Sequence, residues 1–287
     1  MKKEKNIIRN RKGYLNEDFL FFHLKDKKGI KFEFHYHDFN KIIIFLSGNV
    51  TYLIEGKAYK LKPRDILLVS SNDIHKAIID PNGTYERIII WVNSSFLQEN
   101  NINQCNLLTC FKEASKKKFN LLRLNSEILN SVLHQLEEAY KSSEFGSYIL
   151  RNALFLQFMV YINRMFLGNE NHKELSDIEY DKNIGRVLDY INENLNKELS
   201  IDNISSKFYM SKYYLMHKFK KQTGYTIHNY IQNKRLIMAN SLIKKGKSVT
   251  EACVECGFGD YSNFIRAFKK MFGLSPKKYY KRFDKLE

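Results

Sequence analysis

The sequence predicts an α+β protein of two domains: an antiparallel β-barrel with a helical hairpin, then an all-α domain. Three observations support this class. Short apolar runs between turn residues occupy residues from about 30 to 92, the apolar period becomes helical from about residue 126, and the C-terminal region contains an internal repeat. A chain of 287 residues is long enough for two hydrophobic cores.

The predicted strands are short and rich in β-branched residues. Apolar runs occupy 42–45, 66–69 and 88–92, and side chains alternate in character over 50–55. The segments between them contain the Gly, Pro or Asn that turns require. Short strands at this spacing are typical of an antiparallel barrel or sandwich, and we assign the barrel to residues 1–110.

Two helices are predicted between residues 126 and 167, on either side of Gly146. Each has an apolar stripe at helical spacing: Ile128, Leu129, Val132, Leu133, Leu136 and Tyr140 in the first, and Leu150, Leu154, Phe158, Tyr161 and Ile162 in the second. The stripes suit packing against the barrel or a homodimer interface, and the sequence does not separate the two. The polar stretch 168–177 reads as a linker, so residues 111–176 form a helical packing or dimerisation region.

The net charge of +16 is unevenly distributed. From Asp181 onward the chain has 21 Lys and Arg against 10 Asp and Glu. A basic domain attracts polyanions, of which nucleic acid is the commonest, although a lysine-rich soluble surface has the same composition. The charged N-terminus lacks the apolar segment of a secretory signal, and four cysteines are too few for a disulfide framework. We expect a cytoplasmic protein with no membrane partner.

The repeat lies in residues 177–287, where LMHKFKKQTG at 215–224 aligns with FIRAFKKMFG at 264–273. Each copy follows a short helical segment and a break, which predicts helix-turn-helix units at about 201–222 and 249–272. Ser211 and Asp260 are the candidate N-caps of the two second helices, and Gly257 suits a turn position with positive φ. A helix over roughly 227–245 joins the units, so their second helices can enter successive major grooves of DNA.

The region from about 184 to 284 resembles the DNA-binding domain of AraC/XylS-type transcriptional regulators. The motif that carries the resemblance consists of Gly257-Phe258, Ser262, Phe264, Arg266, Phe268-Lys269-Lys270, Phe272-Gly273, Ser275-Pro276 and Tyr279. Two positions depart from the family pattern: Ala252-Cys253 replaces Ile-Ala after Glu251, and Tyr209 replaces the glycine expected in the first turn. The departures change packing residues and leave the reading faces intact.

Residues beside the predicted core positions of the second helices point outward. These candidate DNA contacts are Lys212, Tyr213, Met216, His217, Lys220, Tyr261, Ser262, Asn263, Arg266 and Lys269. The family's base-reading positions map onto Tyr213, Met216 and His217, and onto Tyr261, Ser262, Asn263 and Arg266. Arginine can bond guanine bidentately and asparagine can bond adenine, whereas lysines mostly hold phosphates.

Cys253 and Cys256 form a C-x-x-C pair without a second pair of cysteine or histidine ligands nearby in the sequence. A zinc or redox site needs such partners, so core packing explains the pair better.

His35-Tyr-His37 and His75 occur in the strand-rich region, which resembles a cupin, a small β-barrel that can bind a metal through His-x-His, a glutamate and a later histidine. Lys41 stands near the glutamate position and opposes metal binding. We expect His35, His37, Lys41 and His75 to bind a small effector. A purely structural barrel and a metal site are the alternatives, and we predict no metal, cofactor or catalytic residue.

The predicted function is sequence-specific transcription regulation. The partners expected from the resemblance are double-stranded DNA, a small-molecule effector such as a sugar, a second copy of the chain, and RNA polymerase. Two other classes remain: a metal-dependent cupin enzyme with a DNA-binding tail, and a non-specific binder of polyanions or membrane surfaces. The duplicated helix-turn-helix argues against the latter, and Lys41 against the former.

Overall fold

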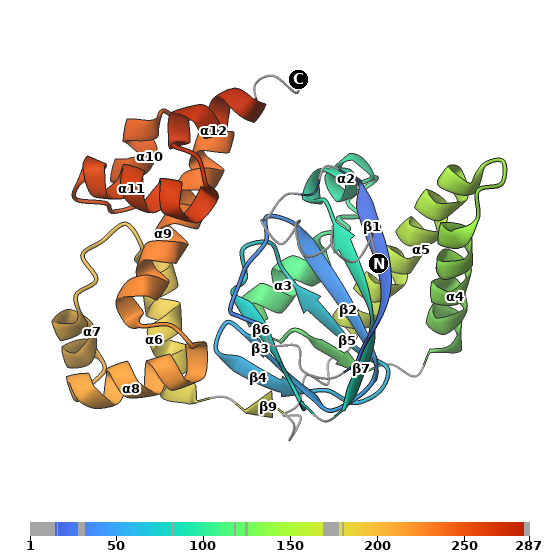
Figure 1. The fold of residues 1–287 in the computed structure, drawn as a ribbon, viewed down its shortest axis with the longest axis horizontal. Coiled ribbons are helices and arrows are strands. Elements are labelled where there is room, and N and C mark those ends of the chain that lie inside the picture. The colour runs from blue at the N-terminus through green and yellow to red at the C-terminus, as the bar shows by residue number, and fades with distance from the viewer. Residues whose placement is uncertain are drawn as a thin grey trace. The chain divides into compact units, whose positions relative to one another are not determined.

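The computed structural model describes residues 15, 17–27, 32–81, 83–117, 119–123, 126–168, 178–179 and 181–283. The chain forms two compact units, Met1–Glu179 and Tyr180–Glu287 (Figure 1). The predicted helical region of 111–176 therefore belongs to the N-terminal unit as far as it is described. Most of the predicted linker, 169–177, lies outside the described residues. None of the helices in the described part of the chain has the length and apolar character needed to cross a membrane.

The N-terminal unit contains two antiparallel sheets (Figure 1). The strands are β1 (Phe19–Lys27), β2 (Asn40–Ser47), β3 (Val50–Ile54), β4 (Lys57–Lys60), β5 (Asp65–Val69), β6 (His75–Ile79), β7 (Thr84–Val92), β8 (Leu121–Arg123) and β9 (Ile178–Glu179). One sheet has the order β1-β7-β2-β5-β8 and the other the order β6-β3-β4-β9. The strand-rich domain is confirmed, with one difference: among the described residues no ladder of hydrogen bonds closes the sheets into a barrel.

The chain passes from one sheet to the other at Gly48, between β2 and β3. Gly48 has a φ of +127°, and a Cβ at this position would lie 2.5 Å from the carbonyl oxygen of Thr84. Only glycine fits such a close backbone approach without strain. The bend explains why two strands separated by two residues pair with different partners. A strand outside the predicted barrel, β9, pairs with β4 through Ile178 and Tyr59.

The central strand β2 is buried on both faces. Ile43 and Phe45 belong to the core between the two sheets, whereas Ile42 and Ile44 belong to the core between the five-stranded sheet and the helices. Alternation of side chains along a strand produces this division. A strand covered on both sides reads in sequence as the continuous apolar run 42–46.

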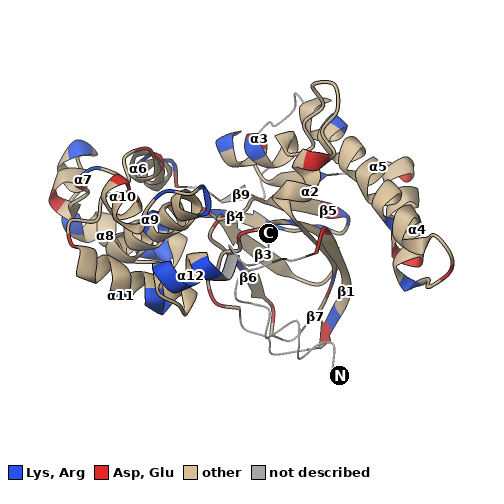
Figure 2. Cartoon of the chain, turned by 90° about the horizontal axis from the view of Figure 1, so that it is seen from above, with Lys and Arg blue, Asp and Glu red and all other residues tan. Residues whose placement is uncertain are grey.

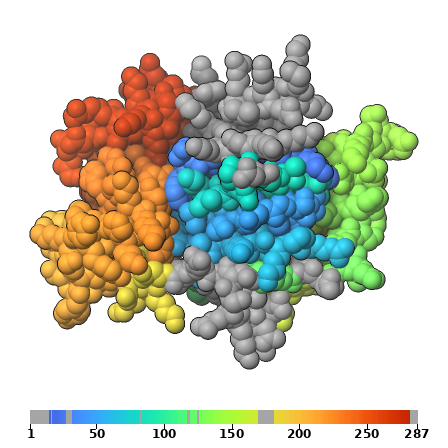
Figure 3. Space-filling view, turned by 60° about the horizontal axis from the view of Figure 1, so that its bottom comes forward, coloured from blue at the N-terminus to red at the C-terminus, as the bar shows by residue number. Residues whose placement is uncertain are grey.

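The helices of this unit are α2 (Ser94–Glu99), α3 (Thr109–Lys117), α4 (Glu127–Lys141) and α5 (Ser147–Gly168). The predicted hairpin of α4 and α5 is confirmed, and Figure 3 shows it in green at one side of the unit. Leu129, Leu136 and Phe158 of the predicted stripes are buried. Ile128 and Leu150, also in those stripes, are exposed, so the hairpin has apolar side chains on its outer surface.

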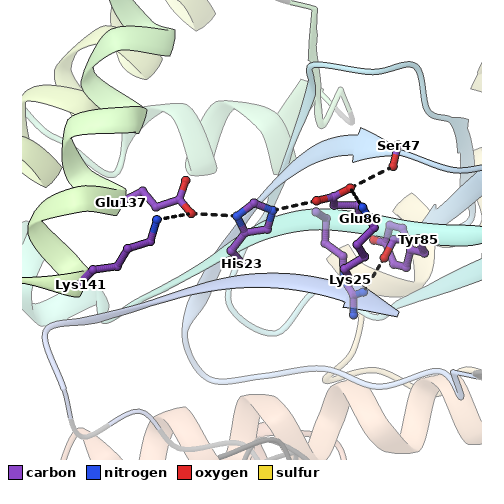
Figure 4. Close-up of polar contacts among 8 residues, drawn as sticks. His23, Lys25, Ser47, Tyr85, Glu86, Glu137 and Lys141 are labelled. Atoms are coloured by element: carbon purple, nitrogen blue, oxygen red, sulfur yellow. Dashed lines mark hydrogen bonds and ion pairs between the residues drawn. The ribbon is translucent and has the colours of Figure 1, made fainter. Parts of the chain in front are cut away.

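A polar network joins the hairpin to the sheet (Figure 4). Nδ1 of His23 on β1 lies 2.8 Å from Oε1 of Glu137 on α4, and its Nε2 lies 3.2 Å from Oε1 of Glu86 on β7. Lys141 and Lys25 pair with the two carboxylates. The contacts place α4 against the outer face of β1 and β7.

The C-terminal unit is entirely helical in its described residues, and Figure 3 shows it from yellow to red. Its helices are α6 (Lys182–Glu193), α7 (Ile201–Lys207), α8 (Lys212–Thr223), α9 (Ile227–Lys244), α10 (Val249–Glu255), α11 (Tyr261–Phe272) and α12 (Pro276–Phe283). The pairs α7–α8 and α10–α11 confirm the two predicted helix-turn-helix units, and α9 confirms the predicted joining helix.

Candidate nucleic-acid interface and effector site

The second helices of the two units, α8 and α11, begin and end in the same way. Ser211 and Asp260 are the N-caps, and their side chains accept hydrogen bonds from the backbone N–H of Tyr214 and Asn263. Both helices end at glycines in the left-handed conformation, Gly224 and Gly273, which glycine adopts without a Cβ penalty. The predicted caps are therefore confirmed, and both helices have defined starting points.

Two buried apolar side chains anchor each helix to its unit, and the opposite face of the helix is exposed. Leu215 and Phe219 of α8, and Phe264 and Phe268 of α11, are fully buried. All ten candidate DNA contacts are exposed: Lys212, Tyr213, Met216, His217, Lys220, Tyr261, Ser262, Asn263, Arg266 and Lys269. The structure thus places five of them on each helix. Their contact with DNA stays a prediction.

Exposed side chains on α8 and α11 contact one another. The ring of Tyr213 stacks on that of His217, with centroids 6.1 Å apart. Nη2 of Arg266 donates to Oδ1 of Asn263 at 2.5 Å. The contact places the guanidinium beside Asn263 on the exposed face of α11, and a guanidinium can bond a base edge bidentately.

The turns of the two units differ in strain. Gly257 in the second turn has a φ of +76°, as predicted for this position. Tyr209 in the first turn has a φ of +53° and is 97% exposed. A side chain in the left-handed region costs free energy, so the departure from the family's glycine places modest strain beside α8.

A cleft of ≈ 830 Å³ lies beside the exposed face of α11. It is bordered by the start of α7, by α9 and by α11, with Asn263 and Arg266 on its wall. His228, Gln232 and Lys270 also border it, together with the acidic Asp202 and Asp260. The sequence analysis did not select His228, Gln232 or Lys270 as DNA contacts, although Lys270 stands in the repeated Phe-Lys-Lys motif.

Basic residues gather on the last two helices of this unit. Figure 2 shows Lys and Arg in blue along α12 and near α11. Lys277, Lys278 and Lys281 of α12 follow Lys269 and Lys270 of α11 in the sequence. A cluster of positive charge near α11 suits contacts with phosphates.

The Cys253–Cys256 pair lies in the helical core, where both thiols are buried. Burial raises the pKa of Cys256 to about 12 and also raises the pKa of Cys253. Protonated buried thiols are poor metal ligands and nucleophiles. The core-packing interpretation therefore fits the structure.

The predicted effector residues come together in the N-terminal unit. Nζ of Lys41 on β2 lies 2.8 Å from Nε2 of His37 and 3.1 Å from Nε2 of His75 on β6. The ring of His35 lies 4.3 Å from that of His75, centroid to centroid. Reciprocal backbone hydrogen bonds of 3.0 and 2.9 Å also join His35 to His75. Lys41 and the two histidines it contacts are buried, so the cluster lies inside the unit.

The backbone defines the protonation of two imidazoles. Nδ1 of His35 lies 2.7 Å from the carbonyl oxygen of Glu33, and Nδ1 of His75 lies 2.9 Å from that of Asp73. A carbonyl oxygen only accepts, so both Nδ1 atoms carry the hydrogen. Burial, with Lys41 as the next cause, holds the pKa of His37 and of His75 well below its usual value. Neutral imidazoles can accept hydrogen bonds from the Lys41 ammonium.

The aromatic side chains of Phe39 and Trp91 lie next to His37 of the cluster, and the sequence analysis missed both. Trp91 is the direct cross-strand partner of Lys41, and its ring lies 4.9 Å from Phe39 and 4.8 Å from Phe22. Nε1 of Trp91 and Nδ1 of His37 are buried without a hydrogen-bond partner among the described residues. Alternation of side chains along residues 85–92 could have indicated that Trp91 shares a side of the sheet with Tyr85.

Comparisons with known proteins agree with this architecture. The model of an AraC-like ligand binding domain matches residues 20–159, and that of a helix-turn-helix domain matches residues 204–282. The HTH-type transcriptional activator RhaR of Mannheimia succiniciproducens is 26% identical over 258 residues, which cover 88% of this chain and 89% of the relative. The HTH-type transcriptional activator RhaS of an Enterobacter species is 26% identical over 249 residues, covering 85% of each.

A crystal structure of ToxT from Vibrio cholerae with bound unsaturated fatty acid is 16% identical. The matched region covers 92% of this chain and 95% of the ToxT chain, with a TM-score of 0.40.

A β-sheet domain of the ligand-binding type, joined to a tandem helix-turn-helix, defines a class of transcription regulators that combine sensing and DNA binding in one chain. The chain belongs to the AraC/XylS family of transcriptional regulators.

Proposed function

We propose that this regulator acts in the cytoplasm, not as an enzyme, and reads two DNA half-sites in successive major grooves through α8 and α11. The observation that carries the proposal is the matched pair of capped helices whose exposed faces hold the ten candidate contacts. The joining helix α9 has 18 residues. It is therefore about 27 Å long, a span comparable to the repeat of about 34 Å between successive major grooves on one face of DNA.

Selection of bound sequences from random duplex DNA by the full chain, at about 0.15 M salt, tests this function. We expect a motif with two blocks about one helical turn apart. Binding to all sequences with a steep salt dependence and no enriched motif would refute specific reading. The two relatives named above are transcriptional activators, which supports activation with RNA polymerase as a partner.

We propose further that the N-terminal unit binds a small molecule, such as a sugar, near His35, His37, Lys41 and His75. The buried donors His37 Nδ1 and Trp91 Nε1 support the proposal, because burial of an unpaired polar group costs free energy that a bound acceptor would recover. The rings of Phe22, Phe39 and Trp91 offer apolar surface beside these donors.

Trp91 is the single tryptophan of the chain, so its fluorescence reports on this site. Titration with a panel of sugars and other small polar molecules should shift the emission for the effector. The same compound should then change the affinity for the selected DNA. A Trp91→Phe variant keeps an aromatic ring but loses the N–H, and we expect weaker protection by the effector against thermal unfolding. A panel without any compound that shifts the emission would count against sensing at this site.

The α4–α5 hairpin is the proposed homodimer interface. Its exposed apolar side chains include Ile128, Tyr148, Ile149, Leu150 and Leu167, and Ile149 is 73% exposed. Exposed apolar side chains gathered on a helical hairpin are typical of a protein contact.

Sedimentation of the full chain should show a dimer that Ile149→Glu weakens. Gln135→Glu on the exposed side of α4 adds the same charge and serves as the control. Equal oligomeric states of the two variants and the unaltered chain would exclude the hairpin as the interface.

A further inference from the structure

The three imidazoles of the N-terminal unit are arranged like the ligands of a metal centre. One candidate ligand atom from each of His35, His37 and His75 lies within 4.8 Å of the others. Metal-binding histidines usually donate their second ring N–H to a carbonyl or carboxylate, which fixes the tautomer. His35 and His75 do so through the carbonyls of Glu33 and Asp73. Nε2 is therefore the ring nitrogen that carries the lone pair in both.

Lys41 brings a positive charge to the position between Nε2 of His37 and Nε2 of His75. Its Nζ lies 2.8 Å from Nε2 of His37 and 3.1 Å from Nε2 of His75. Zinc lies about 2.0–2.1 Å from imidazole nitrogen. The Lys41 ammonium satisfies the same two acceptor nitrogens through hydrogen bonds, which are longer and weaker than metal–nitrogen bonds, and the ammonium is covalently attached to the chain. A divalent ion in this position would also face electrostatic repulsion from the lysine.

The position of Lys41 in the fold gives the contact a structural role. Lys41 belongs to β2 of the five-stranded sheet, and His75 belongs to β6 of the four-stranded sheet. The lysine is only 5% exposed although burial of an ammonium is costly. Its hydrogen bonds to the two histidines connect the two sheets near the start of β2, as a metal ion held by the same side chains would.

We propose that the Lys41 ammonium takes the place of a metal ion in this three-histidine cluster, and that its removal opens a site for a transition metal such as Zn²⁺ or Co²⁺. The unaltered domain is then metal-independent because it contains its own cation. This inference concerns the interior of the N-terminal unit and does not depend on the DNA-reading or effector-binding roles.

Two variants of the full chain test the proposal. Lys41→Glu replaces the ammonium by a carboxylate ligand, and Lys41→Met removes the charge with little change of length. Titration with Co²⁺, followed by its visible absorption and by Trp91 fluorescence, should show one bound equivalent in both variants. We expect the affinity to exceed that of the unaltered chain at least about 100-fold, because the repulsion between the ammonium and the divalent ion is removed. Lys60→Glu on β4 makes the same charge change at an exposed position and should bind no better than the unaltered chain. Adding His75→Gln to Lys41→Glu should abolish the gain.

Two results would overturn the proposal. One is tight, stoichiometric binding of Co²⁺ or Zn²⁺ by the unaltered chain. The other is no binding by Lys41→Glu and Lys41→Met when circular dichroism shows both to be folded. If neither variant folds, nitrogen NMR of the unaltered chain decides. Lone pairs on Nε2 of His37 and His75, with Lys41 as donor, support the proposal, and hydrogens on these two atoms refute it.

Discussion

Arg235 on α9 donates from Nε to the carbonyl oxygen of Leu195 at 2.8 Å, in the loop between α6 and α7. Its Nη2 donates to the carbonyl oxygen of Lys197 at 2.6 Å. The same loop contacts Gly257 of the second helix-turn-helix, because a Cβ on Gly257 would lie 2.7 Å from the Leu195 oxygen. The joining helix, the loop before the first reading unit and the turn of the second unit therefore meet at one point. We infer that this point sets the spacing of the two reading helices.

Arg235→Met retains a long side chain at this position, but it should make the spacing between α8 and α11 less fixed. The variant loses both hydrogen bonds from a charged donor, so we expect unfolding of the C-terminal unit to become easier by about 1–3 kcal/mol. Affinity for a two-block DNA site should fall more than affinity for one block alone. Quantitative gel shifts on both DNAs, with Lys245→Met as the control for lost charge, measure the difference. Equal losses on the two DNAs would show that Arg235 does not control spacing.

Gly257→Ala should destabilise the same contact by a different mechanism. The added Cβ would press on a backbone oxygen at a positive φ of +76°. Gly246→Ala is the matched control, because its φ is +87° and nothing lies within 4 Å of the added atom. The control should cost about 1–2 kcal/mol from conformation alone. Gly257→Ala should cost at least about 1 kcal/mol more, through overpacking. Urea unfolding monitored by circular dichroism compares the two, and equal costs would contradict the close packing.

Arg266→Ala should weaken specific DNA binding by about 1–3 kcal/mol and relax the preference at one base position. Asn263→Ala should have part of the same effect, since Asn263 accepts a hydrogen bond from the guanidinium. The double variant should lose less than the sum of the single variants, with a coupling of about 0.5–3 kcal/mol. Lys245→Ala provides the control for lost charge. Unchanged affinity and base preference in Arg266→Ala would remove it from the reading face.

The helices of the C-terminal unit could be predicted from the sequence in detail. Duplication of the Phe-Lys-Lys motif located α8 and α11, and Ser211, Asp260 and Gly257 marked their N-caps and the turn before α11, because caps and turns demand few residue types. The coupling through Arg235 could not be predicted, since it joins a side chain to backbone carbonyls 38 and 40 positions away. A backbone carbonyl can accept a hydrogen bond whatever side chain its residue has, so the residue types at these two positions do not indicate the contact.

The N-terminal unit was less predictable. Local patterns located its strands, but the passage of the chain from one sheet to the other at Gly48 depends on backbone geometry, and the structure has two sheets where a barrel was expected. The His-x-His motif indicated a cluster correctly, whereas Trp91 entered it only through its register opposite Lys41. Strand register is a long-range property that a run of β-branched residues leaves open.

The contact between His23 and Glu137 should make the docking of α4 sensitive to acid (Figure 4). Burial alone would raise the pKa of Glu137, but the hydrogen bond from His23 and the charge of Lys141 together hold this pKa below its ordinary value of 4.5. A carboxyl whose pKa is lowered by folding stabilises the native state above that value, and this contribution disappears as the pH falls through the folded-state pKa.

Glu137→Gln should therefore lose less stability than the unaltered chain between pH 6 and 3, by about 0.2–1 kcal/mol because the pair is partly solvated. Urea unfolding of the N-terminal unit, followed by Trp91 fluorescence, measures the difference, which added salt should reduce. Glu138→Gln on the same helix removes a carboxylate that contacts only Lys141 among the interactions described, and it should retain the full acid sensitivity. An identical pH dependence of Glu137→Gln and the unaltered chain would show that this contact does not stabilise the docked hairpin.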